Sequence, residues 1–166
     1  MFALILLAVF VAAVVFGLAY FIQGPPYVAS SDADAAEILE EVKRVKPTRV
    51  LDMGSGNGKL VIHLAKHGVK ADGVELNPLL VLRSRRAVRK AGLSGNVRIY
   101  WGNFWKFNTA QYDLVVLYAI KHVMPRLESK LTNELSSGAH IVSNYFVFPN
   151  LKPIKKTSRL RVYRVK

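Results

Sequence analysis

The amino-acid sequence predicts an α/β fold, with a doubly wound, mostly parallel sheet that follows an apolar N-terminal segment. Three observations predict it. Short apolar runs alternate with segments of helical spacing through residues 31–166. A glycine-rich turn joins the first apolar run to a helix. The stretch from Met1 to Ile22 contains no charged residue. The 166 residues allow one globular domain and one accessory segment.

Residues 1–23 are predicted to form a transmembrane anchor. At about 1.5 Å per residue, a helix from Met1 to Ile22 would span roughly 33 Å, enough for a bilayer core of about 30 Å. A cleaved signal peptide is the alternative, but it is expected to have a positive amino-terminal region and a shorter apolar stretch. All 24 Lys and Arg residues follow this segment. The positive-inside rule therefore predicts a single-pass protein whose domain lies on the cytoplasmic side.

The segment Gly24-Pro25-Pro26 breaks the anchor, and residues 24–30 are expected to form a linker. A domain of residues 31–166 follows. Ser30 or Ser31 is a suitable N-cap for its first helix, which is expected to end before Pro47.

The rest of the domain alternates strands and helices. Strands are predicted at 48–53, 69–76, 97–100, 113–118, 139–148 and 160–165, and helices at 59–67, 78–91 and 125–135. The run from Leu160 to Val165 alternates as an antiparallel edge strand should. Little room is left for a helix between the last two strands, so we expect a reduced, Rossmann-like sheet of six or seven strands.

The turn Asp52-Met53-Gly54-Ser55-Gly56-Asn57-Gly58 carries most of the functional information. Glycine tolerates φ > 0, and its missing Cβ lets a ligand lie against the backbone. Glu75 is expected near the carboxyl end of the next strand, where the ligand crevice of such a sheet lies. A glycine turn with a distal acid that binds ribose hydroxyls fits two ligand classes, dinucleotides and S-adenosylmethionine.

Charge separates these two ligands better than spacing does. A dinucleotide fingerprint G-x-G-x-x-G would have its third glycine at position 59, where this chain has Lys59. A pyrophosphate would also be repelled by Asp52 immediately before the turn. The methionine end of S-adenosylmethionine carries an ammonium and a sulfonium group, which a carboxylate attracts. The sequence therefore favours the methyl donor.

With these residues the sequence resembles the class I, seven-strand methyltransferases. More narrowly, it resembles the small membrane-anchored group that includes the mitochondrial lysine methyltransferases acting on the c-ring protein of ATP synthase and on the adenine nucleotide translocase. Five blocks match in order between about residues 25 and 150: Pro25-Pro26-Tyr27-Val28-Ala29-Ser30, the glycine turn, Val74-Glu75-Leu76-Asn77-Pro78, Gly102-Asn103-Phe104-Trp105 and Met124-Pro125-Arg126-Leu127-Glu128-Ser129-Lys130-Leu131. Asn57 and Asn103 stand where relatives commonly carry Asp, which keeps hydrogen bonding but removes charge.

The resemblance implies a set of donor-binding residues. Glu75 would bind the ribose, Asn103 and Phe104 the adenine, and Tyr27 and Ser30 would close over the methionine carboxylate. Core packing for Phe104 and a simple linker turn for Tyr27 and Ser30 are the alternatives. The full predicted set is Tyr27, Ser30, Asp52, Gly54, Ser55, Gly56, Gly58, Glu75, Leu76, Asn103 and Phe104.

Methyl transfer from a sulfonium mainly needs a nucleophile aligned about 3 Å from the methyl carbon. A lysine acceptor must be neutral, and an aromatic-lined, desolvated channel lowers its pKa without a dedicated base. Tyr118 is the catalytic candidate, and Asn144, Tyr145 and Phe146 complete the predicted wall. Ordinary core packing is the alternative for each of these side chains.

Partners are suggested by a net charge of +13, which is concentrated on the predicted helix at 78–91 and in the tail from Lys152 to Lys166. A solvated surface, anionic lipid beneath the anchor, an acidic protein surface and nucleic acid could each explain it. No RNP motif or zinc finger is present. The absence of cysteine excludes thiolate metal sites, and the four histidines show no metal-binding spacing.

The sequence thus predicts a membrane-anchored, S-adenosylmethionine-dependent methyltransferase, and the family resemblance implies a protein lysine as acceptor, a membrane protein included. An inner-membrane location follows, mitochondrial in a eukaryote. The alternatives are an RNA, lipid or small-molecule methyltransferase and a non-catalytic donor-binding scaffold.

Overall fold

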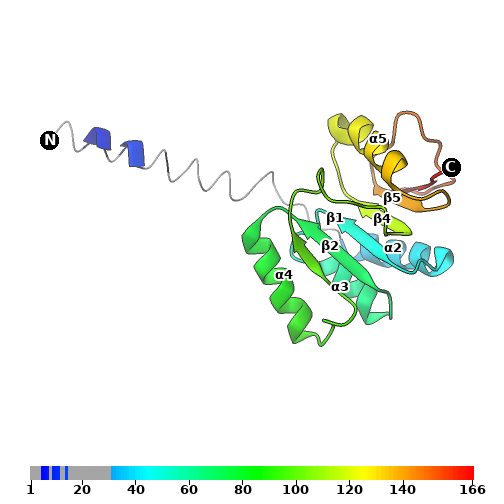
Figure 1. Ribbon diagram of the computed structural model, residues 1–166, viewed down its shortest axis with the longest axis horizontal. Coiled ribbons are helices and arrows are strands. Elements are labelled where there is room, and N and C mark those ends of the chain that lie inside the picture. The colour runs from blue at the N-terminus through cyan, green and yellow to red at the C-terminus, as the bar shows by residue number, and fades with distance from the viewer. Residues whose placement is uncertain (1–4, 8, 12–13, 15–30) are drawn as a thin grey trace.

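The computed structural model describes residues 5–7, 9–11, 14 and 31–166 (Figure 1). The predicted linker lies outside the described residues together with Tyr27 and Ser30, and so does most of the predicted anchor. Within the described ranges, no helix is long and apolar enough to cross a bilayer.

The domain is built on one seven-stranded sheet with the strand order β3-β2-β1-β4-β5-β7-β6. The strands β1 to β5 are parallel, whereas β7 runs antiparallel to both β5 and β6. Their bounds are β1 Val50–Met53, β2 Ala71–Glu75, β3 Ile99–Trp101, β4 Leu114–Leu117, β5 His140–Asn144, β6 Lys155–Lys156 and β7 Leu160–Arg164. This resolves the prediction of six or seven strands in favour of seven.

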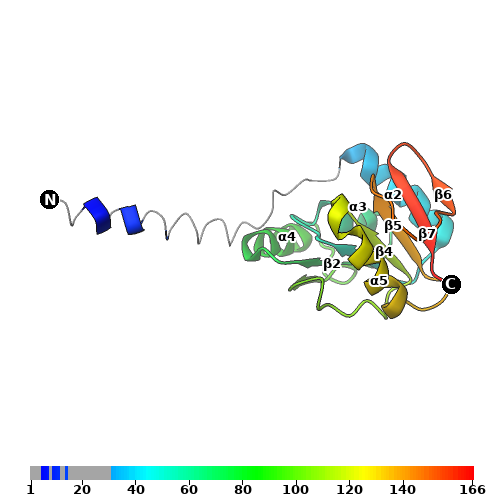
Figure 2. The same cartoon turned by 90° about the horizontal axis from the view of Figure 1, so that it is seen from above.

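Helices cover both faces of the sheet unequally (Figure 2). The helices α2 (Asp32–Val45), α3 (Lys59–Lys66) and α4 (Pro78–Lys90) bury their apolar sides with Val50, Leu114 and Val142 of the sheet in one core cluster. The opposite face is covered by α5 (Met124–Glu134), which follows the short 3-10 helix η1 (Lys121–Val123), and by the segment between β3 and β4. This second cluster includes Tyr112 and Tyr163. The sheet is therefore buried on both sides, as its continuous apolar strands predict.

Local signals in the sequence begin and end the helices next to the site. Ser31 and Asp34 form a capping box at the start of α2, and Lys46 ends this helix in the left-handed region. Asn77 accepts hydrogen bonds from the first N–H groups of α4, and Pro78 occupies its first turn. The expected N-cap at Ser31 is thus confirmed, and the amino ends of both helices are fixed beside the sheet edge at which β1 and β2 end.

Two strand predictions were wrong. The segment Leu160–Arg164 is antiparallel as predicted, but it is not the edge strand, because Lys155–Lys156 pairs with its outer side. A two-residue strand has too little pattern to be recognised from sequence. The strand predicted for 139–148 ends at Asn144, since Tyr145 adopts a φ of 65° and turns the chain away. Within residues 145–159, all of them described, no helix connects β5 to β7, which agrees with the predicted shortening.

Candidate functional site

The site lies where the strand order reverses, between β1 and β4, at the carboxyl ends of the parallel strands. Open α/β sheets bind ligands at this switch point because the connections diverge there to opposite faces and leave a crevice. A cleft at this place is lined by Ile38 of α2, by Asp52, Gly54 and Ser55 of the glycine turn, and by Tyr118 and Asn144 beyond the ends of β4 and within β5.

The glycine turn requires glycine at several positions. Gly54, Gly56 and Gly58 have φ values of 87°, 54° and 79°, which residues with side chains rarely adopt. A Cβ at Gly58 would also lie 2.8 Å from Cβ of Ser84 on α4. A Cβ at Gly54, by contrast, would meet nothing within 4 Å, so the backbone of the turn is open to a ligand there.

Most backbone N–H groups of the turn already have acceptors within the protein. The N–H groups of Gly54 and Ser55 donate to the carbonyl of Val74, and that of Gly58 donates to the carbonyl of Ser55. The N–H of Lys59 at the start of α3 donates to Asn57 Oδ1. A diphosphate needs such N–H groups free, so their occupation disfavours a dinucleotide.

Glu75 connects the turn to the end of β2. Its Oε2 accepts a hydrogen bond from Gly56 N at 2.9 Å, and its Oε1 accepts one from Asn77 N at 2.8 Å. A carboxylate has about four acceptor positions, so two remain for a ligand's hydroxyl groups. The side chain is half-buried, at the place where the sequence predicts a ribose-binding acid.

Asp52 is a buried acid with a raised pKa. Burial raises the pKa of its carboxyl to about 7, and the nearby negative charge of Glu75 contributes in the same direction. No hydrogen bond from another described residue lowers it. A buried carboxylate without a donor is unfavourable, because ionisation there lacks solvation. A cationic ligand group in the cleft would supply the missing partner.

Two further polar side chains at the cleft lack partners among the described residues. Both amide atoms of Asn144 are buried without a hydrogen bond, and so is Ser55 Oγ. Ser55 Oγ fits against the backbone of β2, where a Cβ at Gly73 would come within 2.4 Å of it. Buried polar groups are rarely left unsatisfied without a functional reason. Together with Asp52, these groups fit an ammonium- and carboxylate-bearing ligand such as the methionine part of S-adenosylmethionine.

An aromatic cluster borders the cleft beyond β4 and β5. Tyr118 is 40% exposed, and its ring contacts those of Tyr145 and Phe146 edge-on, with centroids 6.1 and 6.3 Å apart. The strained φ of Tyr145 is held by its N–H, which donates to the carbonyl of Arg159, and by its hydroxyl, which lies 3.3 Å from Asp34 Oδ1. Strained backbone of this kind is often found at functional sites.

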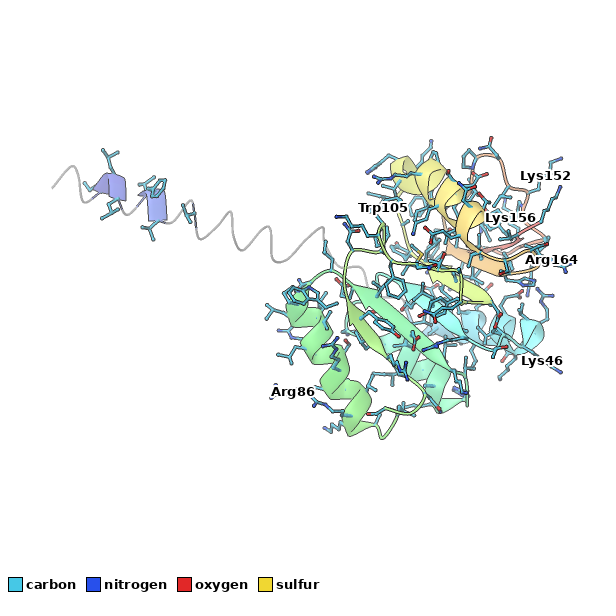
Figure 3. The ribbon with its side chains drawn as sticks, in the orientation of Figure 1. Lys46, Arg86, Trp105, Lys152, Lys156 and Arg164 are labelled. Carbon is cyan, nitrogen blue, oxygen red and sulfur yellow. The ribbon has the colours of Figure 1, made fainter. Side chains whose placement is uncertain are left out.

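Asn103 and Phe104 lie in the turn after β3, the third strand end of this edge. Asn103 Oδ1 accepts a hydrogen bond from Trp105 N at 2.9 Å, so one acceptor position of the amide is used locally. Phe104 is half-buried and packs at the margin of the second core cluster. Trp105, labelled in Figure 3, stacks against the guanidinium of Arg126, 4.2 Å from the ring centroid. Leu76 is exposed directly after Glu75.

The structure brings together at one edge the predicted residues Asp52, Gly54, Ser55, Gly56, Gly58, Glu75 and Tyr118, with Leu76, Asn103 and Phe104 in the neighbouring turns. It also adds Asp34 and Ile38 of α2, which sequence reasoning missed. Asp34 is buried, and although burial opposes ionisation, hydrogen bonding with Ser31 holds its pKa below the usual value. The capping box was the only signal in the sequence for Asp34. Within the described ranges, no cluster of three His, Cys, Asp or Glu residues could hold a metal ion.

Comparison with known proteins identifies the family. A family described as the ANTKMT methyltransferase domain matches residues 52–155, which include the glycine turn, Glu75, Asn103 and Tyr118. The chain belongs to this family. The ANTKMT methyltransferase family is the group that the sequence resemblance indicated, so that prediction is confirmed, as is the predicted class of S-adenosylmethionine-dependent methyltransferase domain.

Among curated proteins, the chain is 38% identical over 128 residues to a Mus musculus lysine N-methyltransferase named for the C-type subunit of ATP synthase. This match covers 77% of the chain but 51% of the mouse protein, so the chain spans about half the length of that relative. A protein-lysine N-methyltransferase of Saccharolobus islandicus is 30% identical, with 77% of this chain and 81% of that protein covered.

Among solved structures, an RNA methyltransferase of Salinibacter ruber in complex with S-adenosyl-L-homocysteine has the same fold. The TM-score is 0.79 at 25% identity, and the match covers 83% of this chain and 94% of that one. Membership in the ANTKMT family and the seven-strand fold are thus established, whereas the substrates and partners of the whole protein are matters for proposal.

Proposed function

We propose that this protein is a membrane-anchored methyltransferase that transfers a methyl group from S-adenosylmethionine to a lysine side chain of a protein. One observation carries the choice of donor: Asp52 is a buried carboxyl without a hydrogen-bond donor, beside a glycine turn whose N–H groups are largely occupied. Such a site attracts a cation and offers little to a diphosphate.

Each predicted residue has a role in donor binding under this proposal. Asp52 attracts the ammonium group, Asn144 and Ser55 supply polar atoms beside it, and Gly54 leaves the backbone open. Glu75 accepts hydrogen bonds from ribose hydroxyls with its two remaining positions, while Leu76, Asn103 and Phe104 line the adenine side. Tyr27 and Ser30, outside the described residues, are proposed to close over the methionine carboxylate.

At the acceptor side, the chain's contribution is to position and desolvate a lysine amine. S-adenosylmethionine, when bound, supplies an activated methyl group, so no strong base is needed for the transfer itself. The aromatic rings of Tyr118, Tyr145 and Phe146 lower the polarity of the opening, which favours the neutral amine. The Tyr118 hydroxyl is the one polar group that we propose to orient the amine.

The anchor and the acceptor class are supported by sequence and relatives. Residues 1–23 are proposed as the anchor, residues 24–30 as a linker and residues 31–166 as the catalytic domain on the cytoplasmic side. The names of the relatives indicate lysine acceptors, one of them in ATP synthase and another in the adenine nucleotide translocase. An enzyme tethered beside the bilayer suits an acceptor that is itself a membrane protein.

The acceptor can be tested with the full chain in detergent or nanodiscs and radiolabelled methyl donor, offered membrane protein, lipid and RNA fractions of the source cell. We expect label on protein, stable to lipase and ribonuclease and recovered as methyl-lysine after hydrolysis. Label in lipid or RNA alone would contradict the lysine proposal, and donor binding without any transfer would indicate a scaffold.

The donor site can be tested by calorimetry. We expect Glu75→Ala to weaken S-adenosylmethionine and S-adenosylhomocysteine binding by about 1 to 3 kcal/mol, because charge-assisted hydrogen bonds are lost. Glu40→Ala is the matched control, since Glu40 is an exposed acid paired with Lys43 on α2. Equal affinities of the two variants would remove Glu75 from the site. Binding of NADH in place of the methyl donor would overturn the proposal.

RNA methylation is the second candidate, because a solved RNA methyltransferase shares the fold over 94% of its length and this chain is strongly basic. It predicts RNA binding with a steep salt dependence. Methyl-lysine formation with no label in RNA would decide against it.

A further inference from the structure

An exposed apolar and basic surface lies on α4 and the neighbouring edge of the sheet. We call it the α4 face. Its apolar part consists of Leu76, Leu79, Leu82 and Trp101, and its basic part of Arg83, Arg86, Arg89 and Lys90. The four apolar side chains are 52% to 66% exposed. Large apolar side chains that gather at one place on a surface, bordered by polar ones, often mark an interaction site.

Helical spacing places these residues on one side of α4. Val81, Ser84 and Val88 face the sheet and are buried. At about 100° per residue, Leu79, Leu82 and Arg86 fall on the opposite, solvent-facing side, and Arg83, Arg89 and Lys90 lie close to them. The leucines occupy the first two turns and the cations the following ones. The α4 face is therefore apolar at the start of the helix and basic towards its end.

Trp101 extends the apolar end of the face onto the sheet. It is the last residue of β3, the edge strand next to α4, and its indole N–H donates to the carbonyl of Leu76 at 3.0 Å. This hydrogen bond fixes the ring beside the first turn of α4 while leaving it 66% exposed. Indole rings with one apolar side and one satisfied polar atom are common at membrane interfaces.

The cations of the α4 face have no acidic partners within the described part of the chain. None of its ion pairs involves Arg83, Arg86, Arg89 or Lys90. The basic tail differs, because Lys155 pairs with Glu41 and Arg159 with Asp34. Positive charge that is available to an external anion is thus concentrated on α4, at the opposite end of the sheet from β6 (Figure 3).

We infer that the α4 face docks onto an anionic lipid bilayer surface. Leu79, Leu82 and Trp101 enter the boundary between headgroups and acyl chains, a depth of about 5 to 10 Å. Arg86 and Lys90 follow Leu82 by about 6 and 12 Å along the helix, at the level of the phosphates. Each such cation contributes about 1 kcal/mol near an anionic surface. Leucine side chains favour lipid over RNA, which would offer them neither stacking nor hydrogen bonds.

Docking orients the site. The start of α4 lies at the carboxyl ends of β2 and β3, the same edge as Glu75 and the glycine turn. Contact through Leu79 and Trp101 therefore turns the acceptor opening towards the bilayer. The eight residues 23–30 can extend over at most about 29 Å, so an anchored domain stays within reach of the surface. This orientation rests on the proposed function, because it presents the site to a lysine at the membrane.

The natural chain has no cysteine, so single labels can be placed cleanly. Leu82→Cys and the control Lys156→Cys, at the opposite edge of the sheet, are labelled with an environment-sensitive fluorophore in the full chain. The chain is reconstituted in vesicles of phosphatidylcholine alone or with one-third phosphatidylserine. We expect nitroxide lipids to quench the label at position 82 several-fold more than that at 156, and phosphatidylserine to increase the difference. Equal quenching at both positions would overturn the inference.

Charge is tested in the Leu82→Cys background by two reversals that change net charge equally. We expect Arg83→Glu with Arg86→Glu to remove the phosphatidylserine-dependent quenching, and Lys152→Glu with Lys156→Glu to keep it. Equal losses would reduce the α4 face to general electrostatics and overturn the inference. A fluorescence response at 82 to an RNA oligonucleotide, with none to vesicles, would also overturn it. Because these readouts need no donor or acceptor, a failed methylation assay leaves them intact and identifies a failure of the proposed function alone.

Discussion

At the scale of single residues, Asp52 gives the site its selectivity. It extends from a buried strand, and burial together with Glu75 raises its pKa to about 7. In the ligand-free protein, ionisation of this carboxyl is therefore costly at neutral pH. A cation in the cleft reverses the balance, because it is attracted by the ionised form only. The same residue thus destabilises the empty site and strengthens the occupied one.

Donor affinity is accordingly expected to depend on pH. Because the pKa of Asp52 is about 7, the ionised fraction falls steeply from pH 7.5 to pH 6, and affinity for S-adenosylmethionine should fall about five- to tenfold. Calorimetric titrations across this range measure it. In Asp52→Asn the affinity should be low and nearly constant with pH. Parallel profiles for the two proteins would remove Asp52 from ammonium binding.

Stability of the ligand-free protein should respond in the opposite direction. The folded-state pKa of Asp52 lies above its ordinary value of 3.8, so the unfolded chain ionises first and this group lowers stability progressively between about pH 4 and pH 7. Relative to wild type, Asp52→Asn should gain about 2 to 3 kcal/mol of unfolding free energy on going from pH 5 to pH 8. Urea unfolding at both pH values measures this gain. An unchanged difference would show that the carboxyl is not desolvated.

At the scale of elements, the glycine turn joins β1 to α3 and fits closely against α4. Gly58 caps α3 in the left-handed region, and only its missing side chain leaves room for Ser84. The turn is thus shaped by packing between helices as well as by its own backbone. Its ligand-facing side is Gly54, which has open space around it.

These two glycines should differ in how they tolerate alanine. Gly58→Ala incurs both the left-handed backbone penalty and overpacking against Ser84, so we expect a loss of about 2 to 4 kcal/mol in urea unfolding. Gly54→Ala incurs the backbone penalty alone, about 1 to 2 kcal/mol. Adding Ser84→Gly to Gly58→Ala should recover the steric part. Equal losses for both single variants would contradict the packing explanation.

At the scale of the whole molecule, the two ends of the parallel strands have separate tasks. The carboxyl ends carry the site, and the amino ends are held by a buried network around Asp72. Asp72 of β2 pairs with Arg49 at 2.7 Å, accepts a hydrogen bond from the Tyr112 hydroxyl at 2.9 Å, and accepts another from Arg98 N at 3.1 Å. These partners lie just before β1, β4 and β3, so one carboxylate links four strands.

Breaking this network should cost stability while leaving donor binding intact. Asp72→Ala leaves the Arg49 guanidinium and the Tyr112 hydroxyl without their acceptor, and we expect a loss of about 3 kcal/mol in unfolding free energy. Tyr112→Phe removes one hydrogen bond and should cost about 1 kcal/mol. Donor affinity measured below the unfolding transition should change less than twofold. A larger change would mean that the two edges are coupled.

Most of the fold could be predicted from the sequence, because its signals are local. Apolar runs bounded by turn residues located the parallel strands, the Ser31 and Asn77 caps located helix starts, and Gly92 marked the end of α4. The lengths of β5 and β6 could not be predicted, since the φ of Tyr145 depends on its partners Arg159 and Asp34, and β6 exists only by pairing with β7.

The family, the seven-strand class and the methyl donor follow from the sequence alone, because an acid beside a glycine turn carries its chemistry wherever the turn folds. How the carboxyl ends of the strands assemble a site is visible only in the folded chain. Folding brings Asp34 and Asn144 beside Asp52, occupies the N–H groups of the turn, and leaves the cations of α4 without acidic partners among the described residues while pairing those of the tail. Burial and pairing depend on residues far apart in the chain, so no local pattern of residues encodes them.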